Sequence, residues 1–598
     1  MRAIETTSSP APVSPTRLTG PAVRTGPGRE SPQSSFDATL TRLDRAVYAA
    51  FARASGGGSP AAFVLAWLDW MLHFACTPAK HYALATHVLA YLESLMTGSL
   101  PDHLGENDPR FDDPGWGHWP FNLLRDAFAQ YESFWQQATS DVRGVSPRNE
   151  QMMHFAARQS TDILSPANCW WLNPQVLRTM VDTAGSNFVK GAHSWLEDLE
   201  DLLACRVPGS SKCRFAPHQL GRDVAATPGK IVYRNPLIEL IQYQPQSHTV
   251  WREPVLLVPS WILKYYVLDL SPHHSLVRYL VERGHTVFMI SWRNPHGESR
   301  DLGLSDYLET GLFDALKQVR RITDAPVHAA GYCLGGTLLA LGAAAHARAH
   351  RKEIPKLKTI TLFAAQTDFS EPGELGLFVD SSRLAYLDAL MWEQGYLDGE
   401  QMAAVFQMLR SHDLIWSRLV REYLLGTRTQ PTDLMAWSAD TTRLPYRLHL
   451  ETLTHFYLHN DFAEGRYHVH GKPVHLGALC VPMFAVGTER DHVSPWRSVY
   501  KLHLLTDTEI GFVLTSGGHN AGIVSAPGHA HRFRFRIRHK GEHYLSPAEW
   551  LDAAPVQHDS WWPCWQQWLA DRSSSQVDPP PVGAGTTLGD APGTYVRE

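Results

Sequence analysis

The chain has 598 residues, of which 44% are hydrophobic and 19% are charged, and its formal net charge at pH 7 is −6. This composition is that of a globular protein long enough for more than one domain, and its mildly acidic balance gives no reason to expect a nucleic-acid partner. Seven cysteines without a CxxC pair leave an odd one over, which favours a reducing compartment over a disulfide framework.

The chain begins with a segment whose composition predicts disorder. Residues 1–35 are rich in Pro, Ser, Thr, Gly and Arg and contain no apolar run. Because a secretory signal needs a hydrophobic core segment, we expect a cytoplasmic protein.

Apolar residues at helical spacing then predict an amphipathic helix over residues 36–51. Residues 61–76 are the most hydrophobic stretch of the chain. They are too few to span a bilayer, and Asp69 and His73 interrupt them, so we expect a core or interfacial helix and no transmembrane segment. Helical patterns continue beyond Asn173–Pro174, a typical helix start. Residues 36–228 are therefore predicted to form a mainly helical N-terminal domain.

A parallel α/β sheet is predicted to begin near residue 229, because short β-branched and aromatic runs now alternate with helical patterns. We expect strands at 231–234, 238–243, 254–259, 286–292, 327–333, 358–364, 481–486 and 510–514. The alternation in 532–540 predicts one more strand, with Phe533, Phe535 and Ile537 facing inward.

The long stretch between the strands predicted at 358–364 and 481–486 has helical segments but no clear strand pattern. We interpret residues 367–478, within a catalytic domain of residues 229–575, as a cap inserted above the strand ends. Residues 576–598 contain a Pro-Pro-Pro run and Gly-rich sequence, and they are predicted to be a disordered C-terminal tail.

The sharpest motif is Gly331-x-Cys333-x-Gly335, which follows a predicted strand and opens a predicted helix. This is the pattern of a nucleophile elbow with sulfur in place of the usual serine oxygen. The strained turn requires nearly side-chain-free neighbours, and it aims the first free helix N–H groups, beginning at Leu334, at an acyl oxyanion. The alternative is a buried free thiol that packs as a small hydrophobe.

Two later turns offer partners for the thiol. Asp491 follows the strand predicted at 481–486, and His519 follows the one at 510–514. Nucleophile, acid and histidine in this order match the triads of α/β-hydrolases. Glu489 and His492 are close rivals, and a surface aspartate and histidine are the alternative interpretation. The sequence has no HExxH motif and no Cys/His quartet, so we expect no metal.

Several further motifs give the sequence a family resemblance over about residues 36–575. They are Thr227–Asn235 with Leu240–Tyr243, Lys264–Leu270, Ser275–Arg278, Gly284–Phe288, Ser291–Pro295, Gly331–Thr337, Asp491–Trp496, Gly518–Gly522 and Ser560–Pro563. With these motifs the chain resembles the polyhydroxyalkanoate synthases, and its length and helical N-terminal half resemble their single-subunit class I branch. It departs from the family at Ser438, where Asn is frequent after Trp, and at Asn520, where Ile is frequent.

The resemblance implies an α/β-hydrolase core with a cap, a Cys333–His519–Asp491 triad and a homodimer. The expected reaction is polymerisation of (R)-3-hydroxyacyl-coenzyme A, in the first place 3-hydroxybutyryl-coenzyme A, at the surface of a cytoplasmic polyester granule. Coenzyme A would then be part of the substrate and a product, and no separate cofactor is expected. Two alternatives stay open, a thioesterase or polyester depolymerase on the same fold and a non-catalytic granule-associated binding protein.

Overall fold

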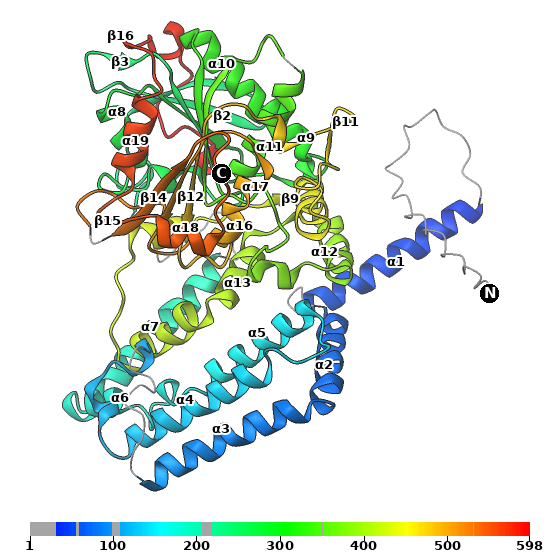
Figure 1. The fold of residues 1–598 in the computed structure, drawn as a ribbon, viewed down its shortest axis with the longest axis vertical. Coiled ribbons are helices and arrows are strands. Elements are labelled where there is room, and N and C mark those ends of the chain that lie inside the picture. The colour runs from blue at the N-terminus through cyan, green and yellow to red at the C-terminus, as the bar shows by residue number, and fades with distance from the viewer. Residues whose placement is uncertain (1–31, 55–58, 98–107, 206–217, 350, 530) are drawn as a thin grey trace, which may run out of the picture. The chain divides into compact units, whose positions relative to one another are not determined.

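The structure is a computed structural model that describes residues 32–54, 59–97, 108–205, 218–349, 351–529 and 531–598 (Figure 1). The chain forms two units, residues 1–47 and residues 48–598. The first unit contributes most of helix α1 (Pro32–Ala54). Apart from its last four residues, which begin α1, the predicted disordered N-terminal segment lies outside the described residues.

A ten-stranded sheet lies at the centre of the second unit, in the order β1-β2-β5-β4-β6-β7-β12-β13-β14-β15. The six strands from β5 to β13 are parallel, and antiparallel strands extend the sheet at both edges. Their bounds are β1 (Gly229–Arg234), β2 (Ile238–Tyr243), β5 (Val287–Trp292), β4 (Val255–Val258), β6 (Val327–Tyr332), β7 (Leu357–Phe363), β12 (Met483–Thr488), β13 (Ile510–Thr515), β14 (Arg532–Arg538) and β15 (Val556–His558). The strand predictions are confirmed.

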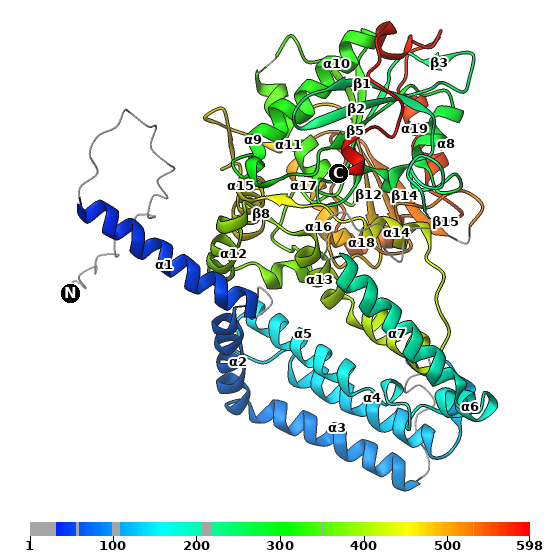
Figure 2. The ribbon, with the colours of Figure 1, turned by 180° about the vertical axis from the view of Figure 1, so that it is seen from behind.

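Helices cover both faces of the sheet, which explains why strands β5, β4, β6, β12 and β13 are buried along their whole length. One face carries α10 (Asp314–Thr323) and α11 (Leu334–Ala349), and the other carries α8 (Leu276–Glu282) and α19 (Trp562–Ala570), which lie side by side in Figures 1 and 2. Strand β14 shows the predicted alternation, because Phe533 is buried and Phe535 packs on Phe484.

The N-terminal half of the unit is helical, as predicted. Its helices are α2 (Pro60–Ala75), α3 (Pro78–Thr97), α4 (Phe121–Ala138), α5 (Pro147–Leu164), α6 (Pro174–Asp182) and α7 (Ser186–Cys205). Three of them begin with a capping side chain followed by proline, at Ser59, Ser146 and Asn173. Within the described residues, no single helix is long and apolar enough to cross a membrane; α2 and α3 pass that test only as a pair bent by 84°.

The residues between β7 and β12 form the helical insertion that was predicted as a cap. It contains α12 (Ser381–Gln394), α13 (Gly399–Leu409), α14 (Asp433–Ala439), α15 (Tyr446–Thr452) and the π-helices η8 (His412–Trp416), η9 (Leu419–Leu424) and η10 (Leu453–Leu458). The N-terminal helices pack on this insertion: α2 on α12, α5 on η8, and α7 on η9.

The predicted disorder of residues 576–598 is wrong. Residues Gln576–Val577 form strand β16, which pairs with β3 (Val250–Trp251), and Tyr595 and Val596 are buried. Two buried charges hold the end of the chain. The Glu239 carboxylate accepts hydrogen bonds from the N–H groups of Thr594 and Tyr595, and the Lys264 ammonium donates to the carbonyl of Val596. Leaving either charge unpaired would be costly, so the tail is fixed despite its composition.

Candidate active site

Cys333 occupies a sharp turn between β6 and α11. Its φ is +53°, in the left-handed region that a residue with a side chain rarely adopts. A Cβ on Gly331 would lie 2.4 Å from Cα of Gly336, and one on Gly335 would lie 2.3 Å from the carbonyl oxygens of Val258 and Pro259. The strained, glycine-flanked turn predicted from the motif is therefore present, with strand β4 against the start of the helix.

The start of α11 leaves a backbone donor beside the thiol. The N–H groups of Gly336 and Thr337 bond to the carbonyl of Cys333, whereas no acceptor for the N–H of Leu334 is found among the described residues. The position of Leu334 thus fits its predicted role as an oxyanion donor.

Asp491 and His519 lie on loops that follow the neighbouring parallel strands β12 and β13. Thr488 and Thr515 pair at the ends of these strands, so both loops leave the same edge of the sheet. The Nδ1 atom of His519 lies 2.8 Å from Oδ2 of Asp491. The other carboxylate oxygen accepts the N–H groups of Val493 (2.9 Å) and Ser494 (2.8 Å), which fix it in place.

The site favours an ionised acid and a protonated histidine. Burial opposes charge on the Asp491 carboxyl, but the pairing with His519 and two backbone N–H groups lower its pKa below the usual value. Burial likewise opposes charge on the imidazole, yet Asp491 and the sulfur of Cys333 outweigh it and hold the pKa of His519 well above its ordinary value. Both predicted partners therefore favour the protonated form of His519.

The two rivals have other surroundings. Glu489 pairs with Arg532 at 3.1 Å, and the side chain of His492 is exposed, while its carbonyl accepts the N–H of Glu374. Of the candidate acids and histidines, the structure brings together Asp491 and His519.

Sequence reasoning did not single out two tyrosines beside these groups. The ring of Tyr332, just before Cys333, lies 5.4 Å from that of His519, and its hydroxyl donates to Oδ1 of Asn520 at 2.5 Å. From the cap, Tyr457 lies close enough to Cys333 and Asp491 that, after burial, these two groups contribute to raising its pKa. The signal at Asn520 was only its departure from the resembled family, and Tyr457 had none.

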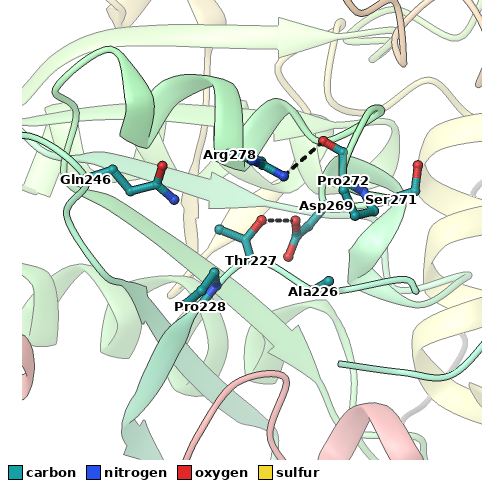
Figure 3. Close-up of a pocket in the computed structure, with 8 residues that line it drawn as sticks. All are labelled: Ala226, Thr227, Pro228, Gln246, Asp269, Ser271, Pro272 and Arg278. Carbon is teal, nitrogen blue, oxygen red and sulfur yellow. Dashed lines mark hydrogen bonds between the residues drawn. The ribbon is translucent and has the colours of Figure 1, made fainter. Parts of the chain in front are cut away.

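Other family-like motifs meet at a separate pocket of about 300 Å³, which has none of the triad residues in its lining (Figure 3). Asp269 accepts hydrogen bonds from Thr227 (2.5 Å) and Ser275 (2.7 Å), and burial raises its pKa to about 6. Ser275 also caps α8 by accepting the N–H of Arg278. These residues tie the entry of β1 to the start of α8, which is a structural role.

In the described part of the chain, no three His, Cys, Asp or Glu side chains are grouped to hold a metal ion.

Comparison with known families gives three matches. Residues 38–80 match the model described as poly-beta-hydroxybutyrate polymerase N terminal, and residues 107–280 match the model described as poly-beta-hydroxybutyrate polymerase N-terminus. Residues 253–526 match the model of the alpha/beta hydrolase fold, in agreement with the observed sheet and elbow.

Curated relatives share most of the chain. A poly(3-hydroxyalkanoate) polymerase of Methylorubrum extorquens is 36% identical over 82% of this chain and 80% of its own length. A poly(3-hydroxyalkanoate) polymerase subunit of Cupriavidus necator is 31% identical over 97% of this chain and 99% of its own. Among solved structures, a monoacylglycerol lipase of Paleococcus ferrophilus matches with a TM-score of 0.32 and 13% identity, over 56% of this chain and 99% of that one.

Proposed function

This chain belongs to the poly(3-hydroxyalkanoate) polymerase family and is an acyltransferase on an α/β-hydrolase fold, and we propose that it polymerises (R)-3-hydroxyacyl groups through Cys333, His519 and Asp491. The substrate proposed is (R)-3-hydroxybutyryl-coenzyme A. The observation that carries the proposal is the 2.8 Å contact between His519 and Asp491, and Cys333 also contributes to the raised pKa of the imidazole.

In the first step, the Cys333 thiolate attacks the thioester carbonyl. The raised pKa of His519 places an imidazolium in the site, and the thiolate is the form of a cysteine that acts as the nucleophile. The N–H of Leu334 would donate to the oxyanion of the tetrahedral intermediate. The carbon–sulfur bond to coenzyme A then breaks, and the departing thiolate takes the proton of His519. The products are an acyl-enzyme, free coenzyme A and a neutral imidazole.

In the second step, the neutral His519 removes the proton of a 3-hydroxyl group, and the hydroxyl oxygen attacks the acyl-enzyme carbonyl. An ester bond forms while the bond to Cys333 breaks, so the thiolate and the imidazolium are restored. Asp491 stabilises the imidazolium and holds it by Nδ1. General base catalysis of this kind contributes about 100- to 10,000-fold.

Keeping water away from the acyl-enzyme would separate a polymerase from a hydrolase. Tyr457 of the cap, whose ring packs 4.8 Å from that of Phe369, supports a closed aromatic cover over Cys333.

The test is to incubate the purified chain with (R)-3-hydroxybutyryl-coenzyme A and to follow thiol release and the acyl product, beside Cys333→Ala. Thiol release with insoluble polyester, absent from the variant, is the expected result. Release with only free 3-hydroxybutyrate would support the thioesterase instead. No release, with longer acyl chains also inert, would contradict both enzymes and support a binding protein.

We also propose that the chain acts at the polyester granule, because α2 and α3 expose many large apolar side chains. They are Phe63, Val64, Leu65, Trp67, Leu68, Leu72, Tyr82, Val88, Leu89, Leu92, Leu95 and Met96. Such a surface is unusual without a partner. Cosedimentation with polyester beads should fall when Leu65, Leu72 and Leu89 are changed to Gln. The homodimer is likewise a proposal, and sedimentation equilibrium tests it.

A further inference from the structure

The hydroxyl of Tyr332 and the amide of Asn520 join the two catalytic loops directly. Tyr332 is the last residue of β6 and is 2% exposed, and its hydroxyl donates to Oδ1 of Asn520 at 2.5 Å. Tyr332 immediately precedes Cys333, and Asn520 immediately follows His519. One hydrogen bond therefore connects the flanks of the proposed nucleophile and the proposed base, which are far apart in sequence.

We propose that the Tyr332–Asn520 hydrogen bond is a positioning device that holds His519 over Cys333 while the sulfur carries an acyl group. This inference rests on the proposed function. Tyr332 and Asn520 act through His519, so they are positioning residues.

The reason lies in what His519 loses during the reaction. In the free site, the imidazole contacts Asp491, and both Asp491 and the sulfur of Cys333 favour its protonated form. Acylation turns the thiolate into a neutral thioester, so the interaction with the sulfur weakens at the stage when His519 must take a proton from the 3-hydroxyl. Among the described residues, the 2.8 Å contact at Nδ1 is then the hydrogen bond that holds the ring, and the ring can turn about it.

The tyrosine restricts this movement in two ways that do not depend on the state of the sulfur. Its ring packs against the imidazole, with centroids 5.4 Å apart and planes 39° apart. Its hydroxyl fixes the backbone after His519 relative to the backbone before Cys333. Reaction rates depend steeply on such geometry, because a displacement of about 1 Å can cost about 100-fold.

The device depends on both side chains. An isoleucine at position 520 could not accept a hydrogen bond from a tyrosine. A buried hydroxyl without an acceptor is unfavourable, so replacing one member alone should disturb the site more than replacing both with apolar residues.

The experiment separates acylation from elongation. Rapid-quench measurement of coenzyme A released in the first turnover reports acylation of Cys333, and steady-state polymer formation reports elongation. With Tyr332→Phe and with Asn520→Ile, we expect acylation within about twofold of wild type and elongation about tenfold slower. The double variant should elongate no more slowly than either single variant, because the hydrogen bond can be lost only once.

The matched control is Tyr500→Phe. Tyr500 is also 2% exposed, and its hydroxyl donates to the carbonyl of Leu545 at 2.9 Å. Its removal should leave the ratio of the two rates unchanged. Equal slowing of both rates by Tyr332→Phe, additive effects in the double variant, or unchanged elongation would overturn the inference. If the wild type releases no coenzyme A at all, the proposed function fails and this inference fails with it.

Discussion

His519 and Asp491 link the charge state of the site to the stability of the fold. The raised pKa of His519 adds stability that is complete below its unfolded value, about 6.5, and that is lost as pH rises through the folded value. The lowered pKa of Asp491 adds stability that is complete above its unfolded value, about 3.9, and that is lost as pH falls through the folded value.

The contribution of this pair should therefore be greatest between about pH 4 and about pH 6.5. We expect the difference in melting temperature between the wild type and Asp491→Asn to be largest in this window and to shrink on both sides. Thermal unfolding at half-unit steps from about pH 2.5 to about pH 9 measures it. A difference that kept growing above pH 8 would contradict the raised pKa of His519.

Gly335 lets the start of α11 approach the backbone at the end of β4 more closely than a residue with a side chain would permit. A Cβ there would lie 2.3 Å from two backbone carbonyl oxygens, which cannot move as a side chain can. We expect Gly335→Ala to lower the free energy of unfolding by about 3 kcal/mol or more. The matched control is Gly477→Ala, where the nearest atom lies 3.9 Å away. Urea unfolding compares them, and equal stabilities would show that the elbow can relax.

The residues that sequence could identify are those with local signals. Cys333 stands in a five-residue motif, and Asp491 and His519 follow strands in a known order. Tyr332 and Asn520 lack such a signal, because their hydrogen bond joins distant parts of the chain and neither residue type predicts the other. Contacts of this kind appear only once the sheet has brought β6 and the loop after β13 together.

At the scale of elements, the strands were predictable because central parallel strands are apolar on both faces. The ordered C-terminal segment was not, because its local composition favours disorder and its order depends on Glu239 and Lys264 in the core. The composition of a segment indicates how much apolar surface it can bury. It does not show that buried charges elsewhere in the chain, here Glu239 and Lys264, need this segment as a hydrogen-bond partner.

The end of the chain should accordingly contribute to stability through Glu239. This carboxylate is fully buried, and it also pairs with Arg234. Deletion of residues 593–598 removes the N–H and hydroxyl donors of Thr594 and the N–H of Tyr595. Because hydrogen bonds to a charged group are worth about 1.5–3 kcal/mol each, we expect a loss of about 3 kcal/mol or more in the free energy of unfolding.

A double-mutant cycle isolates this effect. In a Glu239→Gln background the same deletion should lower the free energy of unfolding by less. A buried neutral amide that loses hydrogen-bond donors is less unfavourable than a buried carboxylate that loses them. Asp590→Ala is a control close to the deleted residues, since the exposed side chain of Asp590 pairs with Lys230 and its loss should change stability little. Equal cost of the deletion in both backgrounds would assign the stabilisation to packing or to the Lys264 contact with Val596 instead.

At the scale of the whole molecule, the N-terminal helices contact the helical insertion between β7 and β12. Arg158 of α5 pairs with Glu374, and Asn187 of α7 donates to the carbonyl of Leu424. The strongest cluster surrounds Asp198 of α7, which accepts hydrogen bonds from Arg418, Arg428 and Tyr423. The helical insertion that these contacts hold also carries Tyr457, whose pKa is raised by burial and by Cys333 and Asp491.

Loosening this contact should admit water to the acyl-enzyme. Asp198→Asn keeps the size of the side chain but weakens three charge-assisted contacts to the cap. We expect this variant to form severalfold more free 3-hydroxybutyrate, and correspondingly less polymer, for each coenzyme A released. Glu200→Gln removes the same charge from an exposed position on the same helix and should leave the product ratio unchanged. Hydrogen exchange of residues 415–428 should increase only in the first variant. If exchange increased without a change in products, α7 would hold the cap but the cap contact would not be what excludes water.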